Sequence, residues 1–244
     1  MKDFDTGRTV PFFATIINVI SRRLVFQNVP FTVATVDPRA DDLRLLWKDE
    51  SGRPLATLER VEAWAAVQKK PLLLATNAGI YSREWRPLGL HVERGKTLVK
   101  LNRAKGSGGN FSMRPNGVFA VTTAGKAIVK ETEAFARARL QVRLASQSGP
   151  LLLAKGRFHP AFQKRSPNAK IRNAVGATGE GRAVFALAHA PVTFWTLASL
   201  FKDALNCPDA LYLDGSISGM LCPAASCREP GADSFVGIFA VLAP

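Results

Sequence analysis

The stretch Asp209-Ala210-Leu211-Tyr212-Leu213-Asp214-Gly215-Ser216-Ile217-Ser218-Gly219 predicts a short buried strand that ends in a carboxylate and is followed by small residues. A strand end holds its last side chain rigidly, and the glycines allow a ligand to approach the backbone closely. Taken alone, an Asp-Gly pair after a strand is more often a plain turn than a catalytic site. The rest of the chain has to decide between the two.

The same order of elements occurs twice. A helix over residues 194–206, capped by Thr193 and ended by Pro208, precedes the strand that leads to Asp214. An earlier amphipathic helix over residues 55–69 ends before Pro71, and the strand that follows runs into Asn77. We therefore expect Asn77 and Asp214 to lie at two neighbouring strand ends that open on one cleft.

Short apolar runs separated by turn residues fill most of the remaining chain. The turns end in glycines expected to need positive φ, namely Gly95, Gly125, Gly156 and Gly181. Further strands are predicted over 24–26, 31–36, 43–47 and 235–242. The predicted fold is α+β: one strand-rich domain over residues 24–244, with a mixed β-sheet core built from hairpins and two main flanking helices.

Residues 1–23 are predicted to be an N-terminal arm or a poor signal-like segment. The apolar run over 10–20 is flanked by Arg8 and by Arg22-Arg23, but it lacks a small-x-small cleavage site and its basic pair is on the wrong side. No run in the chain approaches 18 apolar residues, so no transmembrane helix is predicted.

The charge balance indicates an anionic partner. The chain of 244 residues carries a formal net charge of +14, and such a surface attracts phosphate-bearing molecules. The basic residues are dispersed and form no block of five or six, which makes nucleic acid an improbable partner. An anionic small molecule or glycan fits better, and the oligomeric state stays open.

Neither cysteine nor histidine spacing points to a cofactor. Cys222 and Cys227 enclose a short loop, and a disulfide and two free thiols are about equally compatible with the sequence. The three histidines are scattered and form no HExxH pattern, so no metal is predicted, although calcium bound by oxygen ligands stays open.

Polar residues follow several apolar runs where a core would not normally contain them. They are Asn77, the stretch Gln147-Ser148-Gly149-Pro150, the pair Arg172-Asn173, and Asp214. Each has an ordinary interpretation, since amides favour turns and an arginine often forms a surface pair. Together they favour one common site.

These residues belong to an ordered set of short motifs: Asn77-Ala78-Gly79, Pro87-Leu88-Gly89-Leu90, Gly109-Asn110-Phe111, Pro115-Asn116-Gly117-Val118-Phe119, Gln147-Ser148-Gly149-Pro150, Ile171-Arg172-Asn173 and Leu211-Tyr212-Leu213-Asp214-Gly215. In this order the chain resembles the phosphodiester glycosidase family, and its bacterial branch most closely, over about residues 25–242. One departure is that Asp214-Gly215 is followed by Ser216-Ile217-Ser218-Gly219, where the animal-type members carry further glycines. The resemblance therefore implies the fold and the general site more strongly than the substrate.

The family resemblance implies a hydrolase that cleaves sugar-1-phosphodiester linkages on an anionic, envelope-derived glycan, in the periplasm or outside the cell. Without a clear signal peptide, a cytoplasmic location stays open. The expected catalytic residues are Asp214 as the carboxylate, Arg172 as a bidentate phosphate ligand, and Asn77. The expected substrate-binding residues are Gly79, Asn110, Gln147, Ser148, Gly149, Asn173, Gly215, Ser216 and Ser218.

Glycosidases commonly use two carboxylates, and the sequence does not identify a second one. Glu84 is a candidate, although a surface role is the commoner interpretation, and His159 is as well explained by a structural role as by base catalysis. A non-catalytic module that binds anionic envelope polymers is the main alternative function. A serine hydrolase using Ser148 or Ser218 is disfavoured because no GxSxG motif occurs.

Overall fold

A computed structural model describes residues 19–104, 106, 108–215, 217–231 and 234–244. The first strand, β1, begins at Ile20, so most of the expected N-terminal arm lies outside the described residues. No described helix has the length and apolar character needed to cross a membrane.

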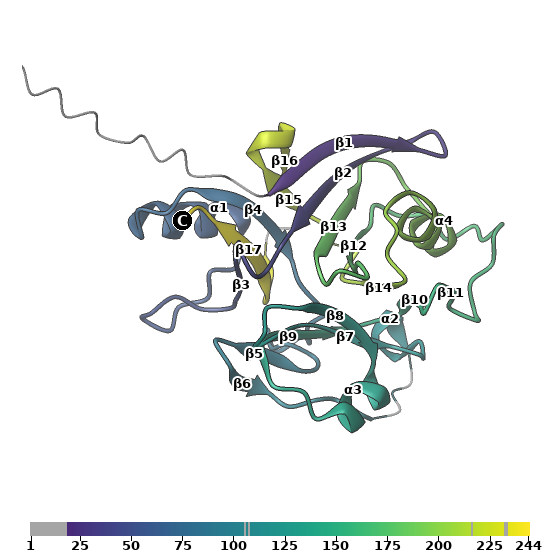
Figure 1. Cartoon of the computed structure of the whole chain (residues 1–244), viewed down its shortest axis with the longest axis horizontal. Coiled ribbons are helices and arrows are strands. Elements are labelled where there is room, and N and C mark those ends of the chain that lie inside the picture. The colour runs from purple at the N-terminus through teal and green to yellow at the C-terminus, as the bar shows by residue number, and fades with distance from the viewer. Residues whose placement is uncertain (1–18, 105, 107, 216, 232–233) are drawn as a thin grey trace, which may run out of the picture.

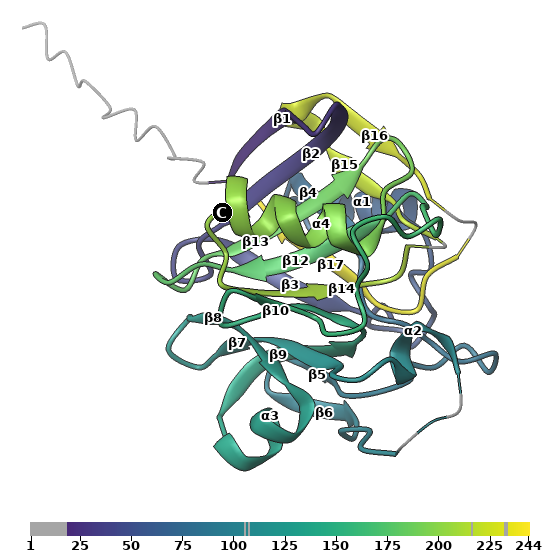
Figure 2. The same ribbon diagram turned by 90° about the vertical axis from the view of Figure 1, so that its right-hand side faces the viewer.

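The described strands form three antiparallel sheets (Figures 1 and 2). The seven-stranded sheet has the order β1 (Ile20–Phe26), β2 (Val29–Val36), β13 (Ala183–Ala188), β12 (Asn173–Ala177), β14 (Asp209–Tyr212), β10 (Leu151–Ala154) and β11 (Arg157–Phe158). The C-terminal sheet has the order β16 (Cys227–Glu229), β15 (Met220–Cys222), β4 (Leu72–Asn77), β17 (Ile238–Leu242) and β3 (Asp42–Leu46). The middle sheet has the order β6 (Lys96–Val99), β5 (His91–Glu93), β9 (Val142–Ser148), β7 (Gly117–Thr122) and β8 (Ala127–Glu131).

The α+β class is confirmed, but the predicted mixed sheet is corrected. Every pairing between described strands is antiparallel, because hairpins and returning segments, not parallel crossovers, connect them. The predicted hairpin turns are confirmed in Gly95, Gly125, Gly156 and Gly181, whose φ angles lie between 73° and 83°.

Each sheet packs a helix against its outer face. Helix α1 (Leu58–Val67), capped by the Thr57 side chain, buries Leu58 and Val61 against the C-terminal sheet. Helix α4 (Phe194–Ser199), which continues as the π-helical turn η1 (Leu200–Ala204), covers the seven-stranded sheet (Figure 2). These are the two predicted flanking helices. The shorter α3 (Thr132–Ala138) covers the middle sheet, and α2 (Gly109–Ser112) and the 3₁₀ turn η2 (Pro223–Ala225) lie in connections.

The three sheets meet in one core, to which each contributes a phenylalanine. Phe119 of β7, Phe185 of β13 and Phe239 of β17 are fully buried, and their ring centroids lie 5.3–5.9 Å apart. Such tilted and edge-to-face contacts add to the burial of apolar area. This shared core fixes the sheets relative to one another, and therefore fixes the strand ends that build the site.

The three cysteines are free thiols. Cys222 and Cys227 face each other across the β15–β16 hairpin and form no disulfide. Cys207 is buried behind η1, next to Gly176, where a Cβ would lie 2.9 Å from the Cys207 sulfur.

Cys207 makes folding stability dependent on pH above the ordinary thiol range. Burial raises the pKa of the Cys207 thiol from 9.0 to about 12, so the folded state keeps its proton where the unfolded chain loses it. Below pH 9 this group has no effect, and above it stability falls as pH rises, by about 1.4 kcal/mol at pH 10. Urea unfolding of the reduced protein at pH 8 and pH 10 is expected to show a smaller loss in Cys207→Ala than in the wild type. Equal losses would contradict this assignment.

Candidate functional site

Asp214 is held through its backbone directly after β14. Its N–H donates to Asn173 Oδ1 at 3.3 Å, and its carbonyl accepts from Asn77 Nδ2 at 3.2 Å and from Ser218 Oγ at 3.3 Å. These three supporting residues are buried, whereas Asp214 is partly exposed. The backbone of Asp214 is therefore fixed in place, and the residue keeps some exposure to solvent.

Two buried asparagines join the seven-stranded sheet to the C-terminal sheet beneath Asp214. Asn77 ends β4 and Asn173 begins β12, and Asn173 Nδ2 donates to Asn77 Oδ1 at 2.9 Å. The same nitrogen lies 3.1 Å from Thr76 Oγ1, and the Gly219 N–H donates to Asn77 Oδ1 at 2.9 Å. Asn77 and Asp214 thus lie together as predicted, although their strands belong to different sheets, and the common cleft stays a prediction.

The middle sheet contributes the third strand end. Ser148 closes β9, is fully buried, and donates from Oγ to the Leu213 carbonyl at 2.7 Å. Gly149 follows in tight packing, because a Cβ there would lie 2.7 Å from the Asn116 Cβ. Strand ends from all three sheets thus hold the Leu213-Asp214 segment. Neither Ser148 nor Gly149 is presented to a ligand, so their expected substrate contacts are replaced by structural roles.

Arg172 also lies inside the protein, with only 1% of its surface exposed. Its guanidinium donates to the Val192 carbonyl at 2.9 Å and to Asn168 Oδ1 at 3.0 Å, and lies 3.8 Å above the Phe194 ring centroid. Burial lowers its pKa, and the nearby Tyr212 raises it. The guanidinium that was predicted to bind phosphate is thus hydrogen-bonded within the protein, to Val192 and Asn168.

Tyr212 is a site residue that the sequence reasoning missed. It is fully buried, and its hydroxyl contacts the Gly215 N–H and lies 3.5 Å from Asn110 Nδ2. Burial raises the pKa of Tyr212, with the Arg172 charge acting in the opposite direction. A Cβ at Gly215 would lie 2.5 Å from this hydroxyl, which explains the need for glycine. A tyrosine in an otherwise aliphatic strand, two residues before the carboxylate, was the available signal.

Gln147 is predicted to bind substrate, and the structure gives it a different role. Its Oε1 accepts from the Leu90 and Asn102 N–H groups, both at 2.9 Å, and its Nε2 donates to the Asn102 carbonyl at 2.7 Å and to Thr132 Oγ1 at 3.2 Å. All of these hydrogen bonds are internal, and Gly89 is packed so closely that a Cβ there would lie 2.3 Å from Oε1. Gln147 therefore anchors the two ends of the β5–β6 hairpin, at Leu90 and Asn102.

Replacing Gln147 with alanine is expected to reduce the free energy of unfolding by about 3 kcal/mol, because the buried Leu90 N–H and the partly buried Asn102 N–H lose their acceptor. Urea unfolding measures this directly. At temperatures where the variant stays folded, the activity per folded molecule is expected to remain within about threefold of the wild type. A stable variant with abolished activity would instead restore the substrate-binding role.

The remaining residues that were predicted to bind substrate lie in different surroundings. Gly79 donates its N–H to Ser146 Oγ at 3.2 Å, and a Cβ there would lie 2.4 Å from the Gln147 carbonyl oxygen. Asn110 is partly exposed beside Tyr212, while Ser216 lies outside the described residues. Among the described residues, no group of three or more His, Cys, Asp or Glu side chains is arranged to hold a metal.

Neither Glu84 nor His159 fits a catalytic role well. Glu84 is exposed, and its hydrogen bond to Ser82 lowers its pKa, which is the opposite of what a general acid needs. His159 is buried, stacks on Phe162 at 4.8 Å, and accepts from the Ala161 N–H through Nδ1.

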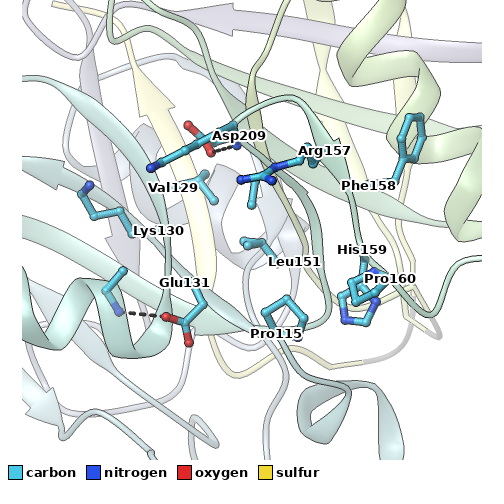
Figure 3. Close-up of a pocket in the computed structure, with 13 residues that line it drawn as sticks. Pro115, Val129, Lys130, Glu131, Leu151, Arg157, Phe158, His159, Pro160 and Asp209 are labelled. Atoms are coloured by element: carbon cyan, nitrogen blue, oxygen red, sulfur yellow. Dashed lines mark hydrogen bonds between the residues drawn. The ribbon is translucent and has the colours of Figure 1, made fainter.

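A cavity of about 390 Å³ lies beside β8 and β10, and His159 is part of its lining (Figure 3). Its polar lining also includes Lys130, Glu131, Arg157 and Asp209, and it contains none of the residues expected to bind substrate and none of Asp214, Arg172 and Asn77. Asp209 begins β14, whereas Asp214 follows its end, and the Asp209 carboxylate accepts from the Lys155 N–H at 2.8 Å. The cavity is thus separate from the site around Asp214.

Comparison with known proteins identifies the family. Residues 71–234 match the sequence profile of the phosphodiester glycosidases. The chain belongs to the phosphodiester glycosidase family. It is 38% identical over 186 residues to the uncharacterized protein YigE of Escherichia coli K12, an alignment that covers 76% of this chain and 72% of that protein.

Two solved structures share the fold of this phosphodiester glycosidase chain. The catalytic domain of zebrafish N-acetylglucosamine-1-phosphodiester alpha-N-acetylglucosaminidase, auto-inhibited by its pro-peptide, superposes with a TM-score of 0.58 at 17% identity, over 92% of this chain and 82% of that one. A putative exported protein of Burkholderia pseudomallei superposes with a TM-score of 0.55 at 12% identity, over 88% and 74% of the two chains.

Proposed function

We propose that the protein hydrolyses sugar-1-phosphodiesters, with Asp214 as its catalytic carboxylate. The observation that carries the proposal is a partly exposed aspartate whose backbone is fixed by two buried asparagines from two sheets and by the buried Ser218 hydroxyl, in a chain of the phosphodiester glycosidase family. Preorganisation of this kind is what a reacting group requires.

In the proposed reaction, the bond between the anomeric carbon and the phosphate oxygen breaks. The electron pair leaves with the oxygen, giving a phosphate monoester, and water supplies the hydroxyl of the released sugar. Asp214 acts on the side of the anomeric carbon, either as nucleophile or by accepting a proton from the attacking water. A phosphate monoester is a far better leaving group than a sugar alcohol, so the reaction depends less on a second, protonated carboxylic acid.

The buried residues support the site without reacting. Arg172 places its positive charge beside Tyr212, whose hydroxyl contacts the N–H of Gly215, the residue next to the carboxylate. In this proposal Arg172 and Tyr212 are positioning residues, and Asn77, Asn173 and Ser218 fix the Asp214 backbone. The positive field of Arg172 and the formal net charge of +14 favour an anionic substrate. A glycan phosphodiester of the cell envelope, met in the periplasm or outside the cell, has the required chemistry.

The direct experiment uses methyl phosphodiesters of several sugars, including N-acetylglucosamine, which the zebrafish enzyme's name specifies. Turnover of at least one substrate, releasing reducing sugar and methyl phosphate in equal amounts, is the expected result. Salt-sensitive binding without turnover of any substrate would favour the alternative, a binding module for anionic polymers.

A further inference from the structure

A short loop after β4 presents a tryptophan to solvent. The loop is closed by hydrogen bonds from the Ser82 N–H to the Arg86 carbonyl at 2.9 Å and from the Trp85 N–H to the Ser82 carbonyl at 3.1 Å. Trp85 is 55% exposed and has a φ of 54°, a conformation that glycine or asparagine adopts more readily than a bulky residue. An exposed aromatic side chain held in an unfavourable backbone conformation is a cue to function.

The Trp85 ring is connected to the site through Tyr81. The two rings stack at 5.3 Å with an interplanar angle of 21°, and the Tyr81 hydroxyl donates to the Ser234 carbonyl at 3.2 Å. Burial raises the pKa of Tyr81, and the negative charge of Asp214 raises it further. The Asp214 charge therefore acts on Tyr81, and Trp85 stacks on the Tyr81 ring.

A cavity of about 310 Å³ opens beside Trp85. Its lining consists of Trp47, Arg53, Pro54, Ala56, Arg60, Trp85, Ser234, Phe235 and Val236. This lining combines aromatic walls with two arginines and contains no carboxylate, although Arg53 is paired at 3.2 Å with Asp49 just outside it. Aromatic rings pack against the apolar faces of sugar rings, and arginine binds phosphate oxygens.

The cavity is also close to the catalytic strand ends in the fold. Phe235 and Val236 lead into β17, where Ile238 pairs with Asn77, and the Ala78 N–H donates to the Gly237 carbonyl at 2.8 Å. The segment that forms one wall of the cavity thus continues into the strand beside Asn77.

We propose that the cavity beside Trp85 is a second substrate subsite, which rests on the proposed function. It binds the neighbouring ring and the neighbouring phosphate of an oligosaccharide whose sugars are joined by phosphodiesters. The ring stacks on Trp85, and the phosphate contacts Arg60 and Arg53. The substrate class is then a phosphate-linked oligosaccharide and not a single sugar phosphodiester.

The test compares a methyl sugar-1-phosphodiester with an oligomer of the same sugar that contains two phosphodiesters. The wild type is expected to have a KM about tenfold lower for the oligomer, and Trp85→Ala and Arg60→Gln are expected to lose most of this difference while their kinetics on the short substrate stay unchanged. Trp85→Phe retains an aromatic ring and is expected to keep part of the difference in KM between the two substrates. Arg86→Gln, which removes an equal charge from the same loop outside the cavity lining, is the matched control and is expected to behave as the wild type.

The Trp85→Gly variant separates an effect on stability from an effect on the preference for the oligomer. Glycine suits the observed φ, so this variant is expected to unfold at the same or a higher temperature and yet lose the preference for the oligomer. A wild type that hydrolyses both substrates with equal KM, or a Trp85→Gly variant that keeps the preference, would overturn the subsite. If neither substrate is hydrolysed, the proposed function fails. Calorimetric binding of the oligomer then decides the subsite, which is rejected if Trp85→Ala binds as tightly as the wild type.

Discussion

Replacing Asp214 with asparagine is expected to lower kcat/KM on a sugar-1-phosphodiester by about 10²–10⁴-fold, the usual contribution of one acid–base or nucleophilic group. The amide has the same shape as the carboxylate, and the hydrogen bonds from Asn77 and Ser218 and to Asn173 all involve the Asp214 backbone. The variant should therefore fold normally and retain substrate binding. Initial rates and the thermal unfolding midpoint provide the two measurements.

The matched control for Asp214 is Glu84→Gln, which removes the exposed carboxylate that the sequence offered as a second catalytic group. Its activity is expected to stay within about twofold of the wild type, since a low pKa makes Glu84 a poor proton donor. Retention of a tenth or more of the wild-type activity by Asp214→Asn, with its fold intact, would remove Asp214 from the centre of the reaction. A large loss in Glu84→Gln would identify that residue as the missing partner.

Replacing Asn173 with alanine is expected to reduce both stability and activity. Asn173 is fully buried, donates to Asn77 Oδ1 at 2.9 Å, and accepts from the Asp214 N–H and from Ser218 Oγ, both at 3.3 Å. Its removal leaves several buried polar groups without a partner, at a cost of about 4 kcal/mol in the free energy of unfolding. The melting temperature should fall by roughly 10 °C.

The activity of Asn173→Ala should fall further than its folded fraction does. Because Asn173 fixes the backbone of Asp214, kcat is expected to drop by about 10²-fold at a temperature where the variant is fully folded. Gln163→Ala removes an exposed amide elsewhere and should leave stability within about 0.5 kcal/mol of the wild type. Normal kcat in a destabilised Asn173→Ala would show that the asparagine pair supports the fold alone.

The sequence predicted the meeting of Asn77 with Asp214 because both follow a helix and a buried strand, and this local order is visible in residue spacing. The arrangement of three sheets was not predictable in the same way. Antiparallel pairing of distant strands, such as β4 with β15 and β17, depends on non-local contacts that periodicity does not encode. The mixed sheet was expected because helix–strand order resembles that of parallel folds.

The hydrogen-bond partners of Gln147 and Arg172 could not be predicted from the sequence. A polar side chain at a strand end can contact a ligand, or it can form hydrogen bonds with other groups of the protein. Only the positions of its partners show which of the two occurs. Gln147 binds the backbone at both ends of the β5–β6 hairpin, and Arg172 donates to the Val192 carbonyl. Tyr212 was missed because its ring fits the apolar pattern of the strand. Its hydroxyl nevertheless contacts Gly215 and Asn110 at the site.

The central claim is that the bond broken joins the sugar to the phosphate oxygen, and isotope labelling tests it most directly. Hydrolysis of a methyl sugar-1-phosphodiester in ¹⁸O-labelled water, followed by mass spectrometry of the methyl phosphate, locates the broken bond. A glycosidase that uses Asp214 at the anomeric carbon is predicted to release unlabelled methyl phosphate. Methyl phosphate carrying ¹⁸O would show attack at phosphorus and contradict the account.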